Sequence, residues 1–148
     1  MNLSSIQWPI FNPYEKATVE LYISGCTRNC KGCHNPELQE FSSGEKLDID
    51  EIIKKLLTKE QLFSIISISG GDLLCQKETE AISLVDALKS AFPNKEMWLF
   101  TGESDFKNIP YWAKDKFDVI KYGPYIHQYA QEGFPSSTNQ RIWRKHEN

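Results

Sequence analysis

The sequence lacks an excess of positive charge. Its 17 lysines and arginines stand against 20 aspartates and glutamates, so the 148-residue chain carries a formal net charge of −3. Proteins that bind nucleic-acid backbones present a basic surface that neutralises phosphates. We therefore expect no nucleic-acid partner.

Long apolar runs are missing as well. No stretch approaches the roughly 20 consecutive apolar residues that a membrane-spanning helix needs. The segment from Met1 to Tyr14 also lacks the basic stretch followed by an apolar run that marks a secretory signal. The sequence therefore predicts a soluble, cytoplasmic protein without a membrane partner.

Internal repeats and low-complexity segments are absent too. With 40% apolar and 25% charged residues, the chain has the composition of one globular domain over residues 1–148. A domain of this size buries about 70% of the surface that its unfolded chain exposes, so it needs neither a disulfide nor a metal in order to fold. Any metal site is therefore expected to serve chemistry.

The spacing of the apolar residues changes repeatedly along the chain. Alternate residues are apolar from Thr18 to Ile23, which is the pattern of a strand. The spacing becomes helical from Ile49 to Leu57, with Asp48 as the expected N-cap. Further on, the patterns predict strands over 65–68, 97–100 and 119–122, a helix over 81–92 that Pro93 stops, and a weaker helix over 105–116 that Pro110 interrupts.

This alternation of strands and helices is typical of parallel βαβ units with right-handed crossovers. The units are fewer than the eight of a complete barrel. The sequence therefore predicts an α/β fold, a single-domain partial (open) β/α barrel with a mostly parallel sheet. Glycines follow the carboxyl ends of the predicted strands, at Gly25, Gly70, Gly71, Gly102 and Gly123. Ligands bind at that edge in barrels and in open sheets.

Cysteines are few, and they are unevenly placed. Cys26, Cys30 and Cys33 fall within eight residues, directly after the first predicted strand, while Cys75 stands alone. A disulfide framework spreads its cysteines along the chain, whereas a tight cluster in a cytosolic protein binds metal or takes part in redox chemistry. For Cys75, the pattern favours a buried small apolar side chain.

Three thiolates leave more than one kind of metal site open. A structural zinc site is closed by four protein ligands, and here the fourth donor is not evident, because His34 is adjacent to Cys33. An iron-sulfur cluster held by three cysteines keeps one iron open to a non-protein ligand. A non-catalytic, zinc-binding interaction module remains the alternative from a different class.

The pattern Cys-x3-Cys-x2-Cys after a first strand resembles the signature of the radical S-adenosylmethionine superfamily. Within that superfamily, the chain resembles the activating enzymes of glycyl radical proteins, above all the short activases of anaerobic ribonucleoside-triphosphate reductase. The resemblance covers nearly the whole chain, through Ser24 to Leu38, Ser69 to Asp72, Phe100 to Gly102, Lys121 to Tyr125 and Thr138 to Arg141.

The resemblance implies two cofactors, a four-iron, four-sulfur (4Fe-4S) cluster and S-adenosyl-L-methionine. The residues that it implies as cluster ligands are Cys26, Cys30 and Cys33. The fourth iron is then left for the amino and carboxylate groups of S-adenosylmethionine.

The same resemblance implies which residues contact S-adenosylmethionine. Backbone at Gly70 and Gly71 is expected near its amino group, with Ser69 and Asp72 as polar partners. The residues expected beside its adenine are Gly32, Cys33 and His34.

Two residues depart from the family's pattern, so the resemblance does not predict the geometry of the turns near the nucleoside. Leu73 stands where the family commonly has proline, and Glu103 stands where it often has an aromatic residue. At Gly71, we expect an added side chain to obstruct the cofactor while leaving the cysteine loop intact.

The implied activity is that of an oxidoreductase that generates a glycyl radical. A flavodoxin- or ferredoxin-type donor reduces the cluster, and S-adenosylmethionine is then cleaved reductively. The implied partner is the large catalytic subunit of anaerobic ribonucleoside-triphosphate reductase. Another glycyl radical protein or a small molecule as the target remains the alternative within the superfamily.

Overall fold

The structure, a computed structural model, describes residues 1–11, 16–28, 39–132, 135 and 137–147. The α-helices of this part of the chain are α1 (Ile49–Leu57), α2 (Glu78–Ala91) and α3 (Tyr111–Lys116). Its strands are β1 (Asn2–Phe11), β2 (Ala17–Ser24), β3 (Glu45–Lys46), β4 (Ile65–Gly70), β5 (Glu96–Phe100), β6 (Val119–Tyr122) and β7 (Arg141–Arg144).

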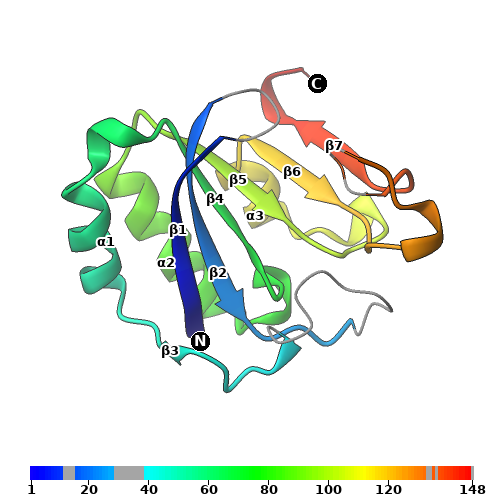
Figure 1. Ribbon diagram of the computed structural model, residues 1–148, viewed down its shortest axis with the longest axis horizontal. Coiled ribbons are helices and arrows are strands. Elements are labelled where there is room, and N and C mark those ends of the chain that lie inside the picture. The colour runs from blue at the N-terminus through cyan, green and yellow to red at the C-terminus, as the bar shows by residue number, and fades with distance from the viewer. Residues whose placement is uncertain (12–15, 29–38, 133–134, 136, 148) are drawn as a thin grey trace.

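These strands form a single sheet in the order β3-β1-β2-β4-β5-β6-β7 (Figure 1). Strands β2, β4, β5 and β6 pair in parallel, whereas β1 is antiparallel to both β2 and β3, and β7 is antiparallel to β6. The helices supply the crossovers that parallel neighbours require. The centre of the sheet thus has the predicted parallel units, and the sheet as a whole is mixed. Curvature into a partial barrel stays a prediction.

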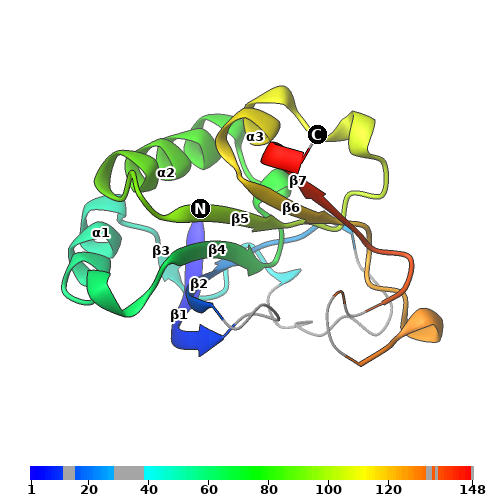
Figure 2. The same cartoon turned by 90° about the horizontal axis from the view of Figure 1, so that it is seen from above.

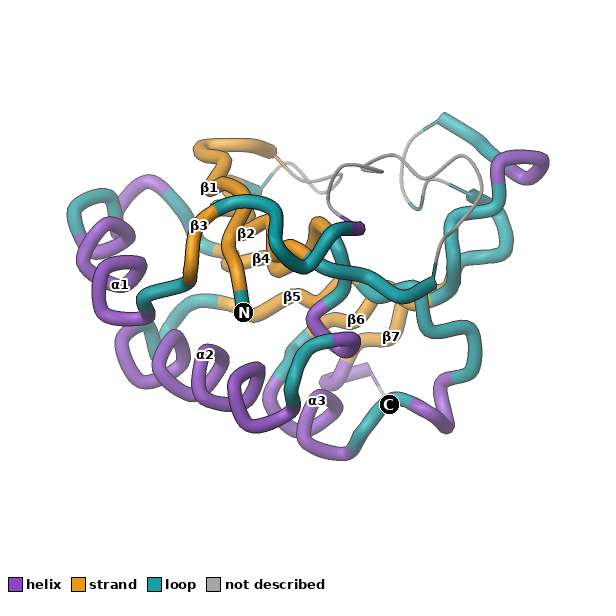
Figure 3. Tube along the Cα trace, turned by 90° about the horizontal axis from the view of Figure 1, so that it is seen from below, coloured by secondary structure: helices purple, strands orange, loops and turns teal. Residues whose placement is uncertain are grey.

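The helices cover one face of the sheet, as Figures 2 and 3 show. Val19, Leu21 and Ile23 of β2 are fully buried in the core on that face, together with apolar residues of α1 and α2. The alternate residues Thr18 and Glu20 are also buried, because the opposite face of β2 is covered too. The period-two pattern therefore separates an apolar face from a polar one, and both are buried.

Local sequence accounts well for the first two helices. The Asp48 side chain accepts a hydrogen bond from the Glu51 backbone N–H at 3.2 Å, which confirms the predicted N-cap of α1. Helix α2 ends at Ala91, just before Pro93, and its predicted apolar face is buried, namely Ala81, Leu84, Val85 and Leu88, followed by Phe92.

The predicted interruption at Pro110 of the weak helix over 105–116 is confirmed, but only the part after Pro110 is α-helical. The chain forms a 3-10 turn over Phe106–Asn108 and then α3, with Pro110 as the N-cap residue between them. A proline lacks the N–H that a helix interior needs, and it also holds the residue before it in an extended conformation. The 3-10 turn therefore ends before Pro110, and α3 begins after it.

The sequence patterns do not predict the outer strands β1 and β7. Strand β1 pairs with β2 along its length, but its register shifts between Leu3 and Ser5 and again between Gln7 and Ile10. Such shifts mark bulges, which interrupt the alternation that a strand pattern relies on. Strand β7 is four residues long, which leaves little length for an alternating pattern.

Candidate functional site

The predicted site lies at the carboxyl edge of the sheet, where the parallel strands β2, β4, β5 and β6 end (Figure 1). Cys26 follows β2, the segment Ser69 to Asp72 spans the end of β4, and the Thr101-Gly102 turn follows β5. The structure brings these segments together. The other predicted site residues lie outside the described residues, namely Cys30, Gly32, Cys33 and His34.

The Gly-Gly turn after β4 packs directly against the backbone that precedes Cys26. The Gly71 N–H donates to the Ile23 carbonyl at 2.7 Å, and the Asp72 N–H donates to the Gly25 carbonyl at 2.9 Å. A Cβ at Gly71 would lie 2.7 Å from the Gly25 nitrogen. The expectation that a side chain here leaves the cysteine loop intact is therefore wrong, since Gly25 adjoins Cys26. Gly70 has a φ of +101°, which favours glycine.

Asp72 is the buried centre of this edge, with 1% of its surface exposed. Its Oδ1 accepts hydrogen bonds from the Leu74 N–H at 3.0 Å and the Thr101 hydroxyl at 2.9 Å. Its Oδ2 accepts from the Gly102 N–H at 2.8 Å and from Arg28 Nε at 2.7 Å. Both carboxylate oxygens are thus engaged by protein donors. A ligand's ammonium group would have to compete with these donors for Asp72.

Arg28 ties the cysteine loop to two other turns. Besides its ion pair with Asp72, its Nη1 lies 3.5 Å from the Glu103 carboxylate. Burial alone would lower the pKa of the Arg28 guanidinium, but the two acidic neighbours, Asp72 above all, raise it over its ordinary value. Glu103, the departure after Thr-Gly, is thereby explained as a partner of Arg28. Arg28 therefore anchors the described start of the cysteine loop, from Cys26 to Arg28, to the turns after β4 and β5.

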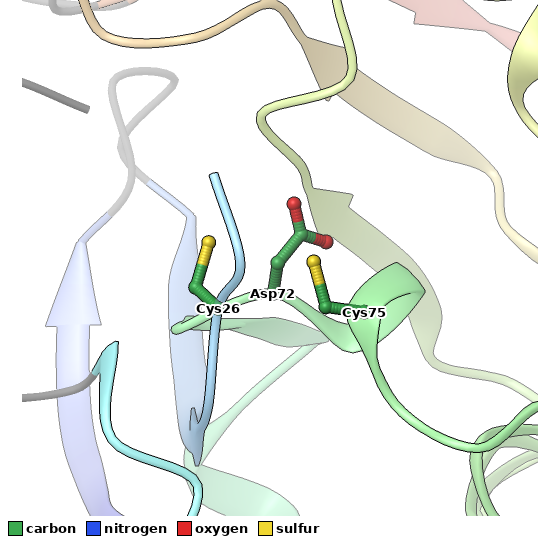
Figure 4. A group of neighbouring side chains, drawn as sticks. All are labelled: Cys26, Asp72 and Cys75. Carbon is green, nitrogen blue, oxygen red and sulfur yellow. The ribbon is translucent and has the colours of Figure 1, made fainter. Parts of the chain in front are cut away.

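Cys75 lies beside Cys26, in contrast to the expectation of a buried apolar role. It ends a 3-10 helix over Leu73–Cys75, is only partly buried, and has its sulfur near that of Cys26 (Figure 4). Its Sγ also lies 3.5 Å from the Thr27 hydroxyl. A hydrogen bond between the two thiols raises the pKa of Cys26 and lowers the pKa of Cys75. Local sequence cannot reveal this neighbour, because it depends on the pairing of β2 with β4.

A buried polar group extends from this edge along the face of the sheet opposite the helices. The Ser69 hydroxyl donates to one Glu20 oxygen at 2.6 Å, and the Tyr22 hydroxyl donates to the other at 3.1 Å. Burial and then Glu20 raise the pKa of Tyr22 to about 12. On β6, Lys121 lies with its ammonium 4.8 Å from the centre of the Phe100 ring. Burial lowers the pKa of Lys121 to about 8.

Lys121 is expected to reduce stability at neutral pH. Its folded-state pKa of about 8 lies below the unfolded value of about 10.4. Below pH 8 the buried ammonium is charged, and its burial penalty exceeds the attraction of Glu20 and Asp72. Stability then rises with pH between the two pKa values, because the unfolded chain binds more protons there. Lys121→Met should therefore raise the free energy of unfolding by about 2 kcal/mol at pH 7, a gain that shrinks toward pH 10.

Urea denaturation from pH 7 to pH 10 measures this effect. Lys107→Met is the matched control, because Lys107 is exposed and its change should leave stability nearly unaltered at every pH. A pH-independent difference between Lys121→Met and the native chain would show that the pKa of Lys121 is not depressed.

Asn139 and Gln140, which belong to the family-like segment Thr138 to Arg141, brace the turn after β6. Gln140 Nε2 donates to the Gly123 carbonyl at 3.1 Å, and its Oε1 accepts from the Ser137 N–H at 3.1 Å. Asn139 Nδ2 donates to the Pro124 carbonyl at 2.8 Å. These side chains position the last loop of the carboxyl edge.

The donors at this edge suit a soft metal ion or cluster. A half-exposed thiol opens the cysteine loop, and thiolates are the ligands that iron-sulfur clusters prefer. Among the described residues, the one group of potential metal-binding side chains is Cys26, Asp72 and Cys75, whose ligand atoms lie within 4.8 Å of one another.

Within the part of the chain that the structure describes, no helix has the length and apolarity to cross a membrane.

Comparison with known proteins agrees with this chemistry. A family model described as a 4Fe-4S single cluster domain matches residues 16–143. The chain is 33% identical over 137 residues to the anaerobic ribonucleoside-triphosphate reductase-activating protein of Vibrio cholerae, covering 84% of this chain and 85% of that protein. The protein of the same name from phage T4 is 32% identical over 130 residues, covering 84% and 82%. The pyruvate formate-lyase-activating enzyme of Clostridium pasteurianum is 34% identical over 73 residues, covering 47% and 29%.

Proposed function

This chain belongs to the 4Fe-4S single cluster domain family, and from that premise we propose that it is the activase of an anaerobic ribonucleoside-triphosphate reductase. It would cleave S-adenosylmethionine reductively and generate a glycyl radical on the large catalytic subunit of the reductase. The observation that carries the proposal is the similarity to two such activating proteins over 84% of the chain. The proposal includes a cytoplasmic location and a flavodoxin- or ferredoxin-type electron donor.

Three cysteine thiolates would hold the cluster, and Cys26 is the one that the structure describes. It stands at the end of β2, next to the backbone of the Gly-Gly turn, and the Cys26 N–H donates to the Gln39 carbonyl at 3.0 Å. This hydrogen bond joins the two ends of the loop that carries Cys30 and Cys33. When bound, the cluster would supply the electron that cleaves S-adenosylmethionine.

The protein's own part in the chemistry would be binding and orientation. Arg28 and Asp72 fix the loop against the turns after β4 and β5, through the 2.7 Å ion pair. Backbone at Gly70 and Gly71, with Ser69 and Asp72, would line the methionine side of S-adenosylmethionine. Gly32, Cys33 and His34 would lie beside the adenine. A preorganised and dry site keeps water from the reacting atoms.

We further propose that the sheet curves as a partial barrel and that the protein substrate closes its open side. A short sheet cannot enclose a radical alone, so a protein docked at the carboxyl edge would supply the missing wall. Reduced enzyme with S-adenosylmethionine should then form 5'-deoxyadenosine slowly, and addition of the reductase should accelerate its formation.

The decisive experiment combines the reconstituted protein, S-adenosylmethionine and reductant with the candidate reductase. We expect a doublet electron paramagnetic resonance signal from a glycine of the reductase. As the control, glycine-to-alanine substitution in the radical loop of the partner should remove the signal and leave complex formation intact. If the reductase gave no radical while a small metabolite stimulated cleavage, the activase proposal would fail.

A second target is kept because the chain also resembles a pyruvate formate-lyase-activating enzyme, over 47% of its length. Another glycyl radical protein would then give the doublet, and the reductase would not.

The alternative function, a non-catalytic zinc-binding module, makes a different prediction. It requires zinc and no iron in anaerobically purified protein, with no affinity for S-adenosylmethionine.

A further inference from the structure

Cys26 and Cys75 stand side by side although they are far apart in the sequence. Their sulfur atoms lie within 4.8 Å of each other, and Figure 4 shows both side chains extending in the same direction from neighbouring segments. Both residues are partly exposed, so a small solute can reach them. The activase proposal uses Cys26 and assigns no role to Cys75.

The position of Cys75 is held by bonds to the backbone just before Cys26. Gln76 Nε2 donates to the Ser24 carbonyl at 3.1 Å and to the Gly25 carbonyl at 3.0 Å. The Cys75 N–H donates to the Asp72 carbonyl at 3.1 Å, and the Asp72 N–H donates to the Gly25 carbonyl at 2.9 Å. The two thiols are therefore neighbours because the ends of β2 and β4 are bonded together.

A separate metal site for Cys26, Asp72 and Cys75 does not fit these contacts. Asp72 is 1% exposed, and its carboxylate oxygens already accept from Arg28, Thr101 and two backbone N–H groups. Only the two thiols remain available. Among the described residues of this group, the two cysteines are thus left as neighbouring, partly accessible thiols, which are suited to disulfide formation.

We propose that Cys26 and Cys75 form a reversible disulfide in the cluster-free protein. A small disulfide such as oxidised glutathione is the oxidant. One cysteine loses its proton and attacks the small disulfide, releasing one small thiol and leaving a mixed disulfide. The second cysteine then displaces the other small thiol. The two protein thiols are oxidised by two electrons in total, and their two protons leave with the two small thiols.

The consequence rests on the proposed function, in which Cys26 is a cluster ligand. A disulfide to Cys75 withdraws that ligand, so the oxidised chain cannot take up a cluster until a thiol reductant frees Cys26. Disulfides in cytosolic proteins are usually transient and redox-sensing. Assembly of the site thereby depends on the same reducing conditions that its chemistry requires.

Trypsin separates the four cysteines, which makes the pairing directly testable. Cleavage after lysine and arginine places Cys26 in peptide 17–28, Cys30 in 29–31, Cys33 in 32–46 and Cys75 in 60–77. Full-length, cluster-free protein is treated anaerobically with oxidised glutathione, alkylated and digested without reductant. We expect peptides 17–28 and 60–77 to be joined, with the loss of two hydrogen atoms, and to separate on reduction. If Cys26 is joined mainly to 29–31 or 32–46, or remains alkylated or glutathionylated, the proposal is wrong.

Iron uptake tests the control of assembly. Oxidised native protein should bind roughly a tenth or less of the iron that the reduced protein binds, and dithiothreitol should restore uptake. After the same oxidation, Cys75→Ser and Cys75→Ala should take up as much iron as their reduced forms. Equal uptake by oxidised and reduced native protein would overturn the control of assembly. If reduced native protein binds no iron either, the proposed function fails, and the peptide map still decides the pairing.

Discussion

Serine in place of Cys26 is expected to abolish the oxygen-sensitive brown chromophore of the reconstituted protein, whereas Cys75→Ser is expected to keep it. Iron in such clusters is bound by soft thiolate ligands, which a serine hydroxyl does not replace. Cys30→Ser and Cys33→Ser should behave as Cys26→Ser does. Iron and acid-labile sulfide analysis after anaerobic reconstitution, with the absorption spectrum, measures the effect.

Cys75→Ser is a close control, because the two sulfur atoms lie within 4.8 Å of each other and both residues are partly buried. The same chemical change is thus made twice at one edge of the sheet, once at a proposed ligand and once beside it. If Cys75→Ser lost iron as completely as Cys26→Ser, Cys75 would be a fourth protein ligand. The model with one open iron would then be wrong.

Asp72→Ala is expected to lower the free energy of unfolding by about 3 kcal/mol, since it leaves a partly buried guanidinium and two backbone N–H groups without their acceptor. For a chain of this size, the melting temperature should fall by roughly 10 °C. Asp72→Asn should lose a similar amount, because its NH₂ would face donors in either orientation. Calorimetry or urea denaturation of the cluster-free protein measures these changes.

Asp105→Ala supplies the matched control. Asp105 also caps a 3-10 turn, where its carboxylate accepts from the Lys107 N–H at 2.9 Å, but its side chain is exposed. Its loss should cost about 1 kcal/mol or less. Equal destabilisation by Asp105→Ala and Asp72→Ala would mean that Asp72 acts only as a local cap, and that its bonds to Arg28 and Thr101 add nothing.

Sequence patterns predict those helices and strands that depend on interactions between residues close together in the chain. The alternation in β2, the N-cap of α1 and the apolar face of α2 each depend on residues within a few positions of one another. Pro110 is another local signal, because it marks the break between the 3-10 turn and α3, although the spacing does not show that the first part is 3-10 rather than α-helical. Strand β1 is not predictable in this way, since bulges interrupt its alternation.

The candidate site is likewise only partly predictable from the sequence. The cysteine spacing and the glycines at the strand ends are visible in the sequence, and they identify the edge and its chemistry. The contacts of Arg28 with Asp72 and Glu103 are not visible, because they join three loops that only the folded sheet brings together. Gly71 is visible as a turn glycine, but its close neighbour is Gly25, which follows the end of β2.

The two outer margins of the sheet bear on how this protein can avoid aggregation. Strand β1 has shifted register at two places, its partner β3 is two exposed charged residues long, and β7 begins and ends with arginine. Bulges, short strands and charged side chains are the features that discourage a foreign strand from adding to a sheet. Self-association through strand addition should therefore be disfavoured. Contact with a large partner is then left to the loops at the carboxyl edge.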